Sequence, residues 1–346
     1  MPETVRLVRF NIILFFIATL CSAQTYPDSK VDSLLRNGID LIISQKYNQA
    51  KKTFKSLDQK YPKIPFGKIY LAATHIARTA DYGLDPGSDS IEDKLDEVVD
   101  LSEGLLDNDE QNIWNNYFMA LSLAYKAYFN ILTGDYISAF SDGYKSVQYY
   151  ERCAEIDSNF YESYLALGTY KYWKSAKTNS FSWLPFIKDN REEGIRLLKK
   201  TINNFAYNKY LALNSLVWIY IDEKEFRKAE DLSKTALKDY PDSRFFIWGL
   251  ARAYEDLDTQ KAINSYGEIL QSLKSENKLF NVNYVILNHK IAMLYYRQNK
   301  YLKALNLLNQ IANVKELNNY EKKVLNSRLV RVDELREKIK EKLNLD

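Results

Sequence analysis

One short pattern occurs four times along the chain, and it limits the kinds of fold that the chain can adopt. In each copy two polar or small residues precede an aromatic residue, and an alanine follows three positions after the aromatic residue. At the opening of a helix, such a ring can fill the mouth of a helical hairpin, while the alanine lets two helices approach closely. The pattern therefore predicts a chain made of repeated helical hairpins. The four copies cover residues 45–50, 134–139, 224–229 and 299–304.

Glycine and proline are scarce, with 11 Gly and 7 Pro among 346 residues. β-Sandwiches and barrels need these residues at their many tight turns, so the shortage argues against an all-β fold and for long helices with short connections. The hydrophobic content of 46% is enough for a large core and argues against disorder.

The residues around the pattern resemble the tetratricopeptide repeat, a 34-residue helix-turn-helix unit. The resemblance is strongest in residues 213–241, which end on Pro241. It implies an all-α fold, namely a right-handed superhelical solenoid of about seven hairpins with a C-terminal capping helix. The apolar positions of the first helix recur 34 positions later: Leu213, Leu216, Val217 and Tyr220, then Ile247, Leu250, Ala251 and Tyr254.

The repeats divide the chain without a linker rich in Pro, Gly or Ser, so we expect one continuous domain over residues 24–346. The clearest repeats are 31–63, 210–241, 244–275 and 285–316, the degenerate or inserted ones are 66–107, 112–158 and 161–206, and the capping helix is 319–345.

The first 23 residues have the pattern of a cleavable secretory signal peptide. Arg6 and Arg9 precede an apolar run over residues 12–20, and cleavage is expected after Ala23. The run is too short to cross a bilayer as a helix, so we expect no membrane span after cleavage. Lipoprotein anchoring at Cys21 is a weaker alternative, because bulky Leu20 precedes it. The protein is therefore predicted to be exported, either periplasmic or secreted.

Composition and motifs argue against several functions. A net charge of +3 does not indicate a nucleic-acid partner. No nucleotide-binding, metalloprotease or hydrolase motif occurs, and His75 and His289 are far apart, so we expect no enzyme, cofactor or metal site. His75 is expected to lie in the core, and Cys153, flanked by aromatic residues, to be buried and inert.

An acidic stretch over residues 85–110 has two interpretations. Residues 85–96 space their aspartates partly like a calcium loop, but they depart from it at three positions, so a plain helix start is the better interpretation. The remaining acids suggest a solvated helix face or, alternatively, a docking surface for a basic partner.

Residues 173–186 form an insertion that a repeat turn does not need. It contains Trp173 and Trp183, and it is either a hydrophobic plug on the solenoid or a contact surface.

The resemblance also implies a concave groove lined by the first helix of each hairpin. From the groove positions and the insertion we expect a ligand or partner site that includes Tyr172, Trp173, Trp183, Trp218, Trp248, Arg252, His289 and Tyr296. The set does not match the Lys and Asn clamp that some members use for terminal carboxylates. The resulting hypothesis is a non-enzymatic exported scaffold that binds a cell-envelope protein or an extended peptide. A glycan or small-molecule binding protein that uses the aromatic groove is the alternative.

Overall fold

The structure, a computed structural model, describes residues 25–345 except 89 and 179–188. This part of the chain is all-α, with one short 3₁₀ turn, η1 (Pro86–Ser88), and no strand. The helices are α1 (Ser29–Ile43), α2 (Tyr47–Lys60), α3 (Phe66–Tyr82), α4 (Ile91–Asn108), α5 (Ile113–Thr133), α6 (Tyr136–Ile156), α7 (Glu162–Thr178), α8 (Arg191–Ile202), α9 (Lys209–Asp222), α10 (Phe226–Asp239), α11 (Arg244–Leu257), α12 (Thr259–Ser275), α13 (Asn281–Arg297), α14 (Tyr301–Ala312) and α15 (Asn319–Leu343).

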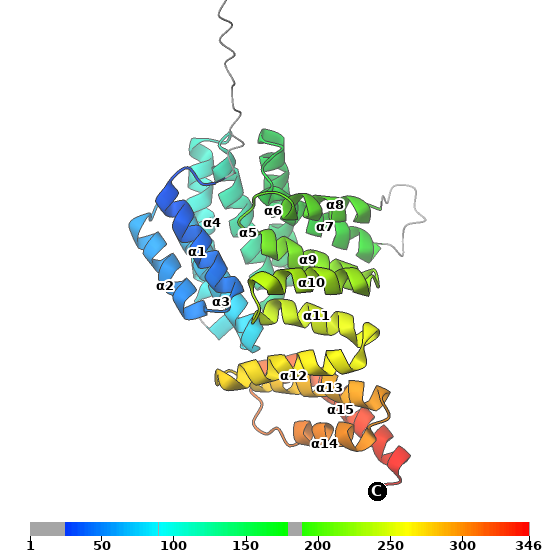
Figure 1. Ribbon diagram of the computed structural model, residues 1–346. Helices are drawn as coiled ribbons and strands as arrows, with labels where there is room; N and C mark the ends of the chain where they lie inside the picture. Colours follow the sequence, from blue (N-terminus) through cyan, green and yellow to red (C-terminus); the bar gives the residue numbers. More distant parts are fainter. Residues whose placement is uncertain (1–24, 89, 179–188, 346) are drawn as a thin grey trace, which may run out of the picture.

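Consecutive helices pair as hairpins, from α1 with α2 to α13 with α14, and α15 packs against α13 and α14 at the end of the array. Figure 1 shows the α7–α8 hairpin at the top of a stack that continues downward through α9, α10, α11 and α12, with α15 at the C-terminal end. Within the described residues, the expected seven hairpins and capping helix are confirmed. None of the described helices has the length and apolar character that a membrane span requires.

The recurring pattern forms the turn of four hairpins. Its first residue lies in the left-handed region in every copy, with φ of 58° at Gln45, 98° at Gly134, 59° at Lys224 and 58° at Asn299. The next residue donates its backbone N–H to the carbonyl five positions earlier, as in a Schellman C-cap; the bond from Lys46 to Leu41 measures 2.8 Å. Each pattern thus ends one helix and starts the next, and its alanine is buried.

Small residues set how closely the helices approach. A Cβ on Gly38 would lie 2.2 Å from the Phe54 ring, so this glycine makes room for that ring between α1 and α2. Gly168 on α7 and Gly194 on α8 face each other, and a Cβ on either would come within 2.7 Å of the other's carbonyl oxygen. Gly38 and Gly168 occupy repeat positions at which the tetratricopeptide resemblance predicts close helix packing, and the structure confirms this role.

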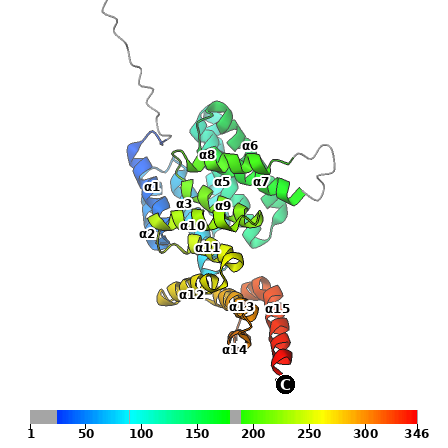
Figure 2. The ribbon, with the colours of Figure 1, turned by 45° about the vertical axis from the view of Figure 1, so that its right-hand side comes forward.

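The first three helices fold back onto later hairpins, which the sequence did not predict. Figures 1 and 2 show α1 on the side of the stack formed by α9 to α11. The Tyr240 hydroxyl donates to Asp40 over 2.7 Å, and Ser243 Oγ donates to the Ile43 carbonyl over 2.8 Å. The N-terminal helices therefore cover the segment between α10 and α11, and the array of hairpins closes on itself.

A buried arginine holds this closure. Arg244, at the start of α11, is 1% exposed and donates to both carboxylate oxygens of Asp81 on α3, at 3.0 and 2.7 Å. Its other amino group bonds Ser272 and Glu276 on the far side. Asn283 of α13 also donates to the Asp81 carbonyl over 2.8 Å.

Other sequence expectations have mixed outcomes. His75 lies in the core with its Nε2 2.9 Å from the Pro86 carbonyl, and Cys153 is buried, as predicted. Burial raises the pKa of the Cys153 thiol to about 12, which keeps it protonated. Residues 173–178, which were predicted to open the insertion, instead form the end of α7. The proposed signal peptide and residues 179–186 of the insertion, with Trp183, lie outside the described residues.

Candidate functional site

An open hollow of about 510 Å³ lies across the C-terminal ends of α7, α9 and α11. It collects three residues that the sequence nominated, Trp173, Trp218 and Arg252, one from each helix. Trp218 is 37% exposed, an unusual state for so large an apolar side chain. We call this surface the tryptophan hollow; its lining consists of Trp173, Trp218, Ile221, Asp222, Lys224, Phe226, Arg252 and Asp256.

A buried tyrosine supports one wall of the hollow. Tyr172 lies under Trp173 with the rings perpendicular and 5.1 Å apart, so it does not line an open groove itself. Its hydroxyl has two acceptors, Asp222 at 2.7 Å and Glu223 at 2.8 Å. Burial, together with these carboxylates, raises the pKa of Tyr172 above its usual range. Arg191 of α8 bonds Glu223 as well, at 3.2 Å, so the wall is tied to two hairpins.

Arg252 joins the hollow to a partly buried ionic cluster. Its guanidinium lies 2.9 Å from Asp256 and 3.3 Å from Glu255. Glu255 also accepts from Lys290 of α13 at 2.7 Å and from the Tyr266 hydroxyl. Burial lowers the pKa of Lys290, and the contact with Glu255 opposes this shift. Arg252 is therefore held in one orientation at the rim.

Trp248 belongs to this cluster rather than to the hollow. Its ring packs edge-on against Tyr266, with centroids 5.6 Å apart, and it is partly buried. Trp218 and Trp248 are both on first helices of successive hairpins, as expected from the sequence, but they do not line the same surface.

His289 and Tyr296 lie further along, where α13 meets α15. His289 is buried, and Arg328 Nη1 is 3.3 Å from its Nδ1. Burial, reinforced by the positive charges of Arg328, Arg331 and Lys290, lowers the pKa of His289 to about 4. Tyr296 packs against Tyr301 with ring centroids 5.5 Å apart. Lys338 and Lys342 of α15 lie over the Tyr296 ring, 5.7 and 5.8 Å from its centroid, so both His289 and Tyr296 connect the last hairpin to the cap.

The structure thus brings together three of the eight nominated residues, and Tyr172 supports them. Sequence reasoning did not nominate Asp222, Lys224, Phe226 or Asp256 for the site. Phe226 was recognised only as the aromatic residue of the repeat, and its place in a hairpin turn beside Trp218 was the signal that could have identified it.

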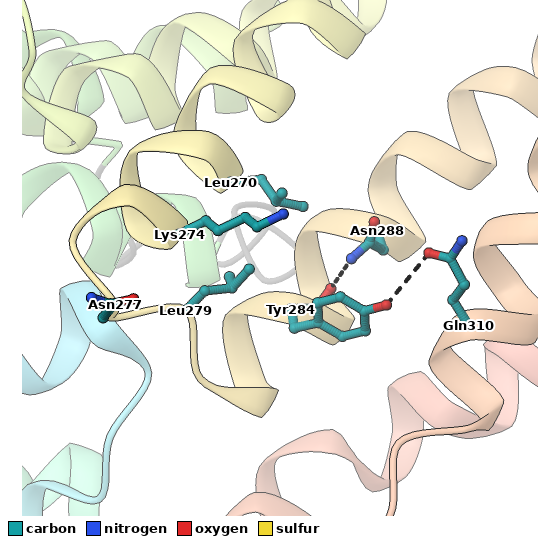
Figure 3. A pocket seen from close by; sticks show the side chains of 7 residues that line it. All are labelled: Leu270, Lys274, Asn277, Leu279, Tyr284, Asn288 and Gln310. Atoms are coloured by element: carbon teal, nitrogen blue, oxygen red, sulfur yellow. Dashed lines mark hydrogen bonds between the residues drawn. The ribbon is translucent and has the colours of Figure 1, made fainter.

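A second hollow, of about 600 Å³, lies between α12, α13 and α14. Figure 3 shows Leu270 and Lys274 of α12 on one side and Tyr284 of α13 on the other. Three polar side chains of this hollow bond one another or the backbone: the Asn288 amide donates to the Tyr284 carbonyl over 2.8 Å, and the Tyr284 hydroxyl donates to Gln310 over 3.5 Å. It presents neither an exposed aromatic face nor an ion pair, so the smaller tryptophan hollow is the better candidate site.

The acidic stretch forms a helix and its entry. Ser90 is the N-cap of α4, in agreement with the helix-start interpretation of residues 85–96. Two of its acids pair with lysines of neighbouring helices: Glu97 with Lys68 at 2.7 Å, and Asp96 with Lys126. In the described parts of the chain, no three His, Cys, Asp or Glu side chains come together as a metal site would need.

The hairpin array with its repeated turns is a helical solenoid of the tetratricopeptide type, as the sequence resemblance implied. No family model and no curated protein matches the sequence.

Solved structures similar to the chain include two bacterial tetratricopeptide-repeat proteins. The C-terminal part of one from Cytophaga hutchinsonii has 18% identity and a TM-score of 0.39, covering 84% of this chain and 99% of its own. One from Parabacteroides merdae has 13% identity and a TM-score of 0.40, with coverages of 86% and 97%. Human IFIT1, solved as a dimer with m7Gppp-AAAA, has 12% identity and a TM-score of 0.48, with coverages of 91% and 79%. At such identities the ligands of these proteins do not indicate what this chain binds.

Proposed function

We propose that the protein is an exported, non-enzymatic scaffold that binds a protein or an extended peptide at the tryptophan hollow. The observation that carries the proposal is the exposure of Trp218 beside Trp173 and Arg252 on a surface shared by three hairpins. Aromatic and arginine side chains are the residues that most often dominate protein interfaces. Extended helical-repeat surfaces commonly bind segments of other proteins.

The charges at the rim suit a polypeptide. Lys224 and Arg252 lie in the same hollow as Asp222 and Asp256, so both signs are available to backbone and side-chain groups of a partner. Because Arg191, Glu223 and Glu255 hold the surrounding groups in place, little ordering remains to oppose binding.

The proposal is tested by a photo-reactive amino acid placed at position 218 in the exported protein. We expect a discrete adduct with an envelope protein, and we expect Arg252→Ala to reduce the yield at least about 10-fold, as for loss of one interface anchor. The matched control carries the photo-reactive group at Leu302, an exposed position on α14. Equal adducts at both positions, or none at 218, would contradict the proposal.

Export itself is tested by fractionation of cells that express the full chain. The proposal expects a shortened protein outside the cytoplasm, with a new N-terminus after Ala23. A full-length cytoplasmic product would exclude the exported role.

A glycan is the second candidate ligand, because the partly exposed rings of Trp173 and Trp218 lie beside carboxylates that can accept from hydroxyls. Titration of tryptophan fluorescence with cell-wall and polysaccharide fragments distinguishes the two ligands. A saturable change that Trp218→Ala abolishes supports the glycan, and no change across the panel removes it.

A further inference from the structure

Among the residues that the structure describes, the largest group of exposed apolar side chains lies away from the tryptophan hollow, at the end of the α5–α6 hairpin where its turn lies. The exposed fractions are 44% for Tyr128, 49% for Ile131, 70% for Tyr136, 86% for Ile137, 78% for Phe140 and 50% for Tyr144. We call this surface the hairpin patch. We propose that it is a self-association surface through which two copies of this chain form a symmetric dimer.

The six side chains lie on one side of the hairpin. Tyr136, Phe140 and Tyr144 recur every four residues on α6, and Tyr128 and Ile131 are three residues apart on α5. The contact between the helices uses other positions: Gly143 faces Ala127, and Asn130 donates to Asp142 over 3.2 Å. Because the helices are antiparallel, the two rows continue one another across the hairpin.

The patch exists because this hairpin is long. α5 and α6 have 21 residues each, whereas α8 has 12. Four of the five buried residues of α6 lie between Ser146 and Cys153, in its C-terminal half, where Tyr150 and Cys153 share a core cluster with residues of α7. The N-terminal half of α6 also has an apolar face, but no neighbouring hairpin in the described part of the chain packs against that face. A solenoid face of this kind normally requires a further layer to cover it.

The area fits a second copy. At about 200 Å² for a fully exposed large side chain, the patch presents on the order of 750 Å². The largest apolar patch of a typical monomer is about 300–600 Å², and each partner of a standard interface contributes about 800 Å². The patch is thus larger than a monomer ordinarily shows and close to what one partner of a dimer supplies.

The charges and the spacing of the side chains also favour a second copy of this chain as the partner of the hairpin patch. Between Tyr136 and Tyr144 the one charged residue is Asp142, which Asn130 binds, so two copies can meet without burying like charges. Ile137, Phe140 and Tyr144 have the i, i+3, i+7 spacing of a helix–helix seam, and Ser141 between them permits close approach of the same helix from a partner. Helices that lie on lipid usually carry Lys or Arg beside the apolar face, and this segment of α6 has neither.

The test is sedimentation velocity of the full chain between about 1 and 100 µM, a range in which interfaces of this size commonly associate. We expect a dimer, and we expect the double variant Ile137→Glu, Phe140→Glu to dissociate at least about 100-fold more readily, because charge would be buried at the seam. Leu302→Glu, at a 69% exposed position on α14, is the matched control and should leave dimerisation unchanged. Circular dichroism verifies that each variant stays helical.

A second measurement places the dimer axis. In a Cys21→Ser background, Ser141→Cys should form a disulfide-linked dimer on mild oxidation, whereas Asn326→Cys, exposed on α15, should not. Cys153 is buried and does not interfere.

Three results would overturn the proposal. One is a chain that stays monomeric throughout the concentration range. Another is a dimer that the double variant leaves intact. The third is a monomer that floats with neutral phosphatidylcholine vesicles and loses this property in the double variant, which would assign the patch to lipid.

Discussion

At the residue scale, the hairpin turns depend on a left-handed residue that the sequence supplies in four different ways. Gln45, Gly134, Lys224 and Asn299 share φ values between 58° and 98°, and only Gly134 adopts such an angle without steric cost. The repeat therefore specifies a backbone conformation that no single residue type reveals. The aromatic residue and the alanine can be recognised in the sequence, whereas the positive φ angle of the first residue is revealed only by the structure.

Gly134→Ala is expected to destabilise the protein by about 1–2 kcal/mol, because a Cβ is strained at this φ. Gly104→Ala is the control, since a Cβ there meets nothing within 4 Å and alanine favours a helix. Urea unfolding followed by circular dichroism measures both. Equal effects of the two substitutions would show that the turn angle costs nothing.

His289 gives a pH dependence with a definite sign. Its pKa of about 4 in the folded state lies below the usual 6.5, so the unfolded chain takes up this proton first as the pH falls. The contribution of His289 to stability is therefore fully present above pH 6.5 and decreases toward pH 4. Between pH 7 and pH 5 the loss should be about 2 kcal/mol.

Unfolding of His289→Gln at the same two pH values isolates this effect. The variant should lose about 2 kcal/mol less than the unmodified protein over the interval, because it has no proton to gain at this site. An identical loss in both proteins would mean that another group causes the pH dependence.

At the scale of helices, close approach depends on glycines that face a neighbour. Gly168 and Gly194 bring α7 and α8 together directly below Tyr172, which supports the tryptophan hollow. The sequence indicated the role of Gly168 because the residue occupies a repeat position. It gave no such indication for Gly194, because a glycine in a degenerate helix has no pattern to identify its partner.

Gly168→Ala should therefore destabilise the protein by about 1–3 kcal/mol, since the new methyl group meets backbone that cannot move aside. Gly267→Ala on α12 should instead stabilise it by about 0.5–1 kcal/mol, because a Cβ there contacts nothing within 4 Å. Thermal unfolding of the two variants checks the contrast, which fails if both shift in the same direction.

At the scale of the whole molecule, closure is the dominant feature. The ion pair between Arg244 and Asp81 joins residues 163 positions apart, and the contacts of Tyr240 and Ser243 with α1 span 200. The closure joins the N-terminal helices to the hairpins that carry the tryptophan hollow. The hollow then remains on the opposite, C-terminal ends of α7, α9 and α11.

Arg244→Ala is expected to cost about 3–5 kcal/mol, because it leaves the carboxylate of Asp81 buried without its partner. Hydrogen exchange should become faster in α1 to α3 before it does in α12 to α15. Arg244→Met combined with Asp81→Ala should recover part of the loss. Arg152→Ala, which removes an exposed pair with Glu155, is the control and should change stability by less than about 1 kcal/mol. If exchange in Arg244→Ala became faster to the same extent in all helices, the contact between α3 and α11 would not open independently of the rest of the array.

The sequence by itself determined the helices, their pairing and their approximate number, because these follow from local periodicity and from turn residues a few positions apart. It also nominated Trp218 and Arg252, because repeat register tells which face of a helix turns inward, and Trp173, because it belongs to the predicted insertion. Only the tertiary structure decided that the array closes through Arg244, that Trp248 and His289 are absorbed into ionic and capping contacts, and that one hairpin leaves an apolar face exposed. Those outcomes depend on contacts between side chains of different helices, 163 positions apart for Arg244 and Asp81, or on the relative lengths of stacked helices, and no local pattern encodes either.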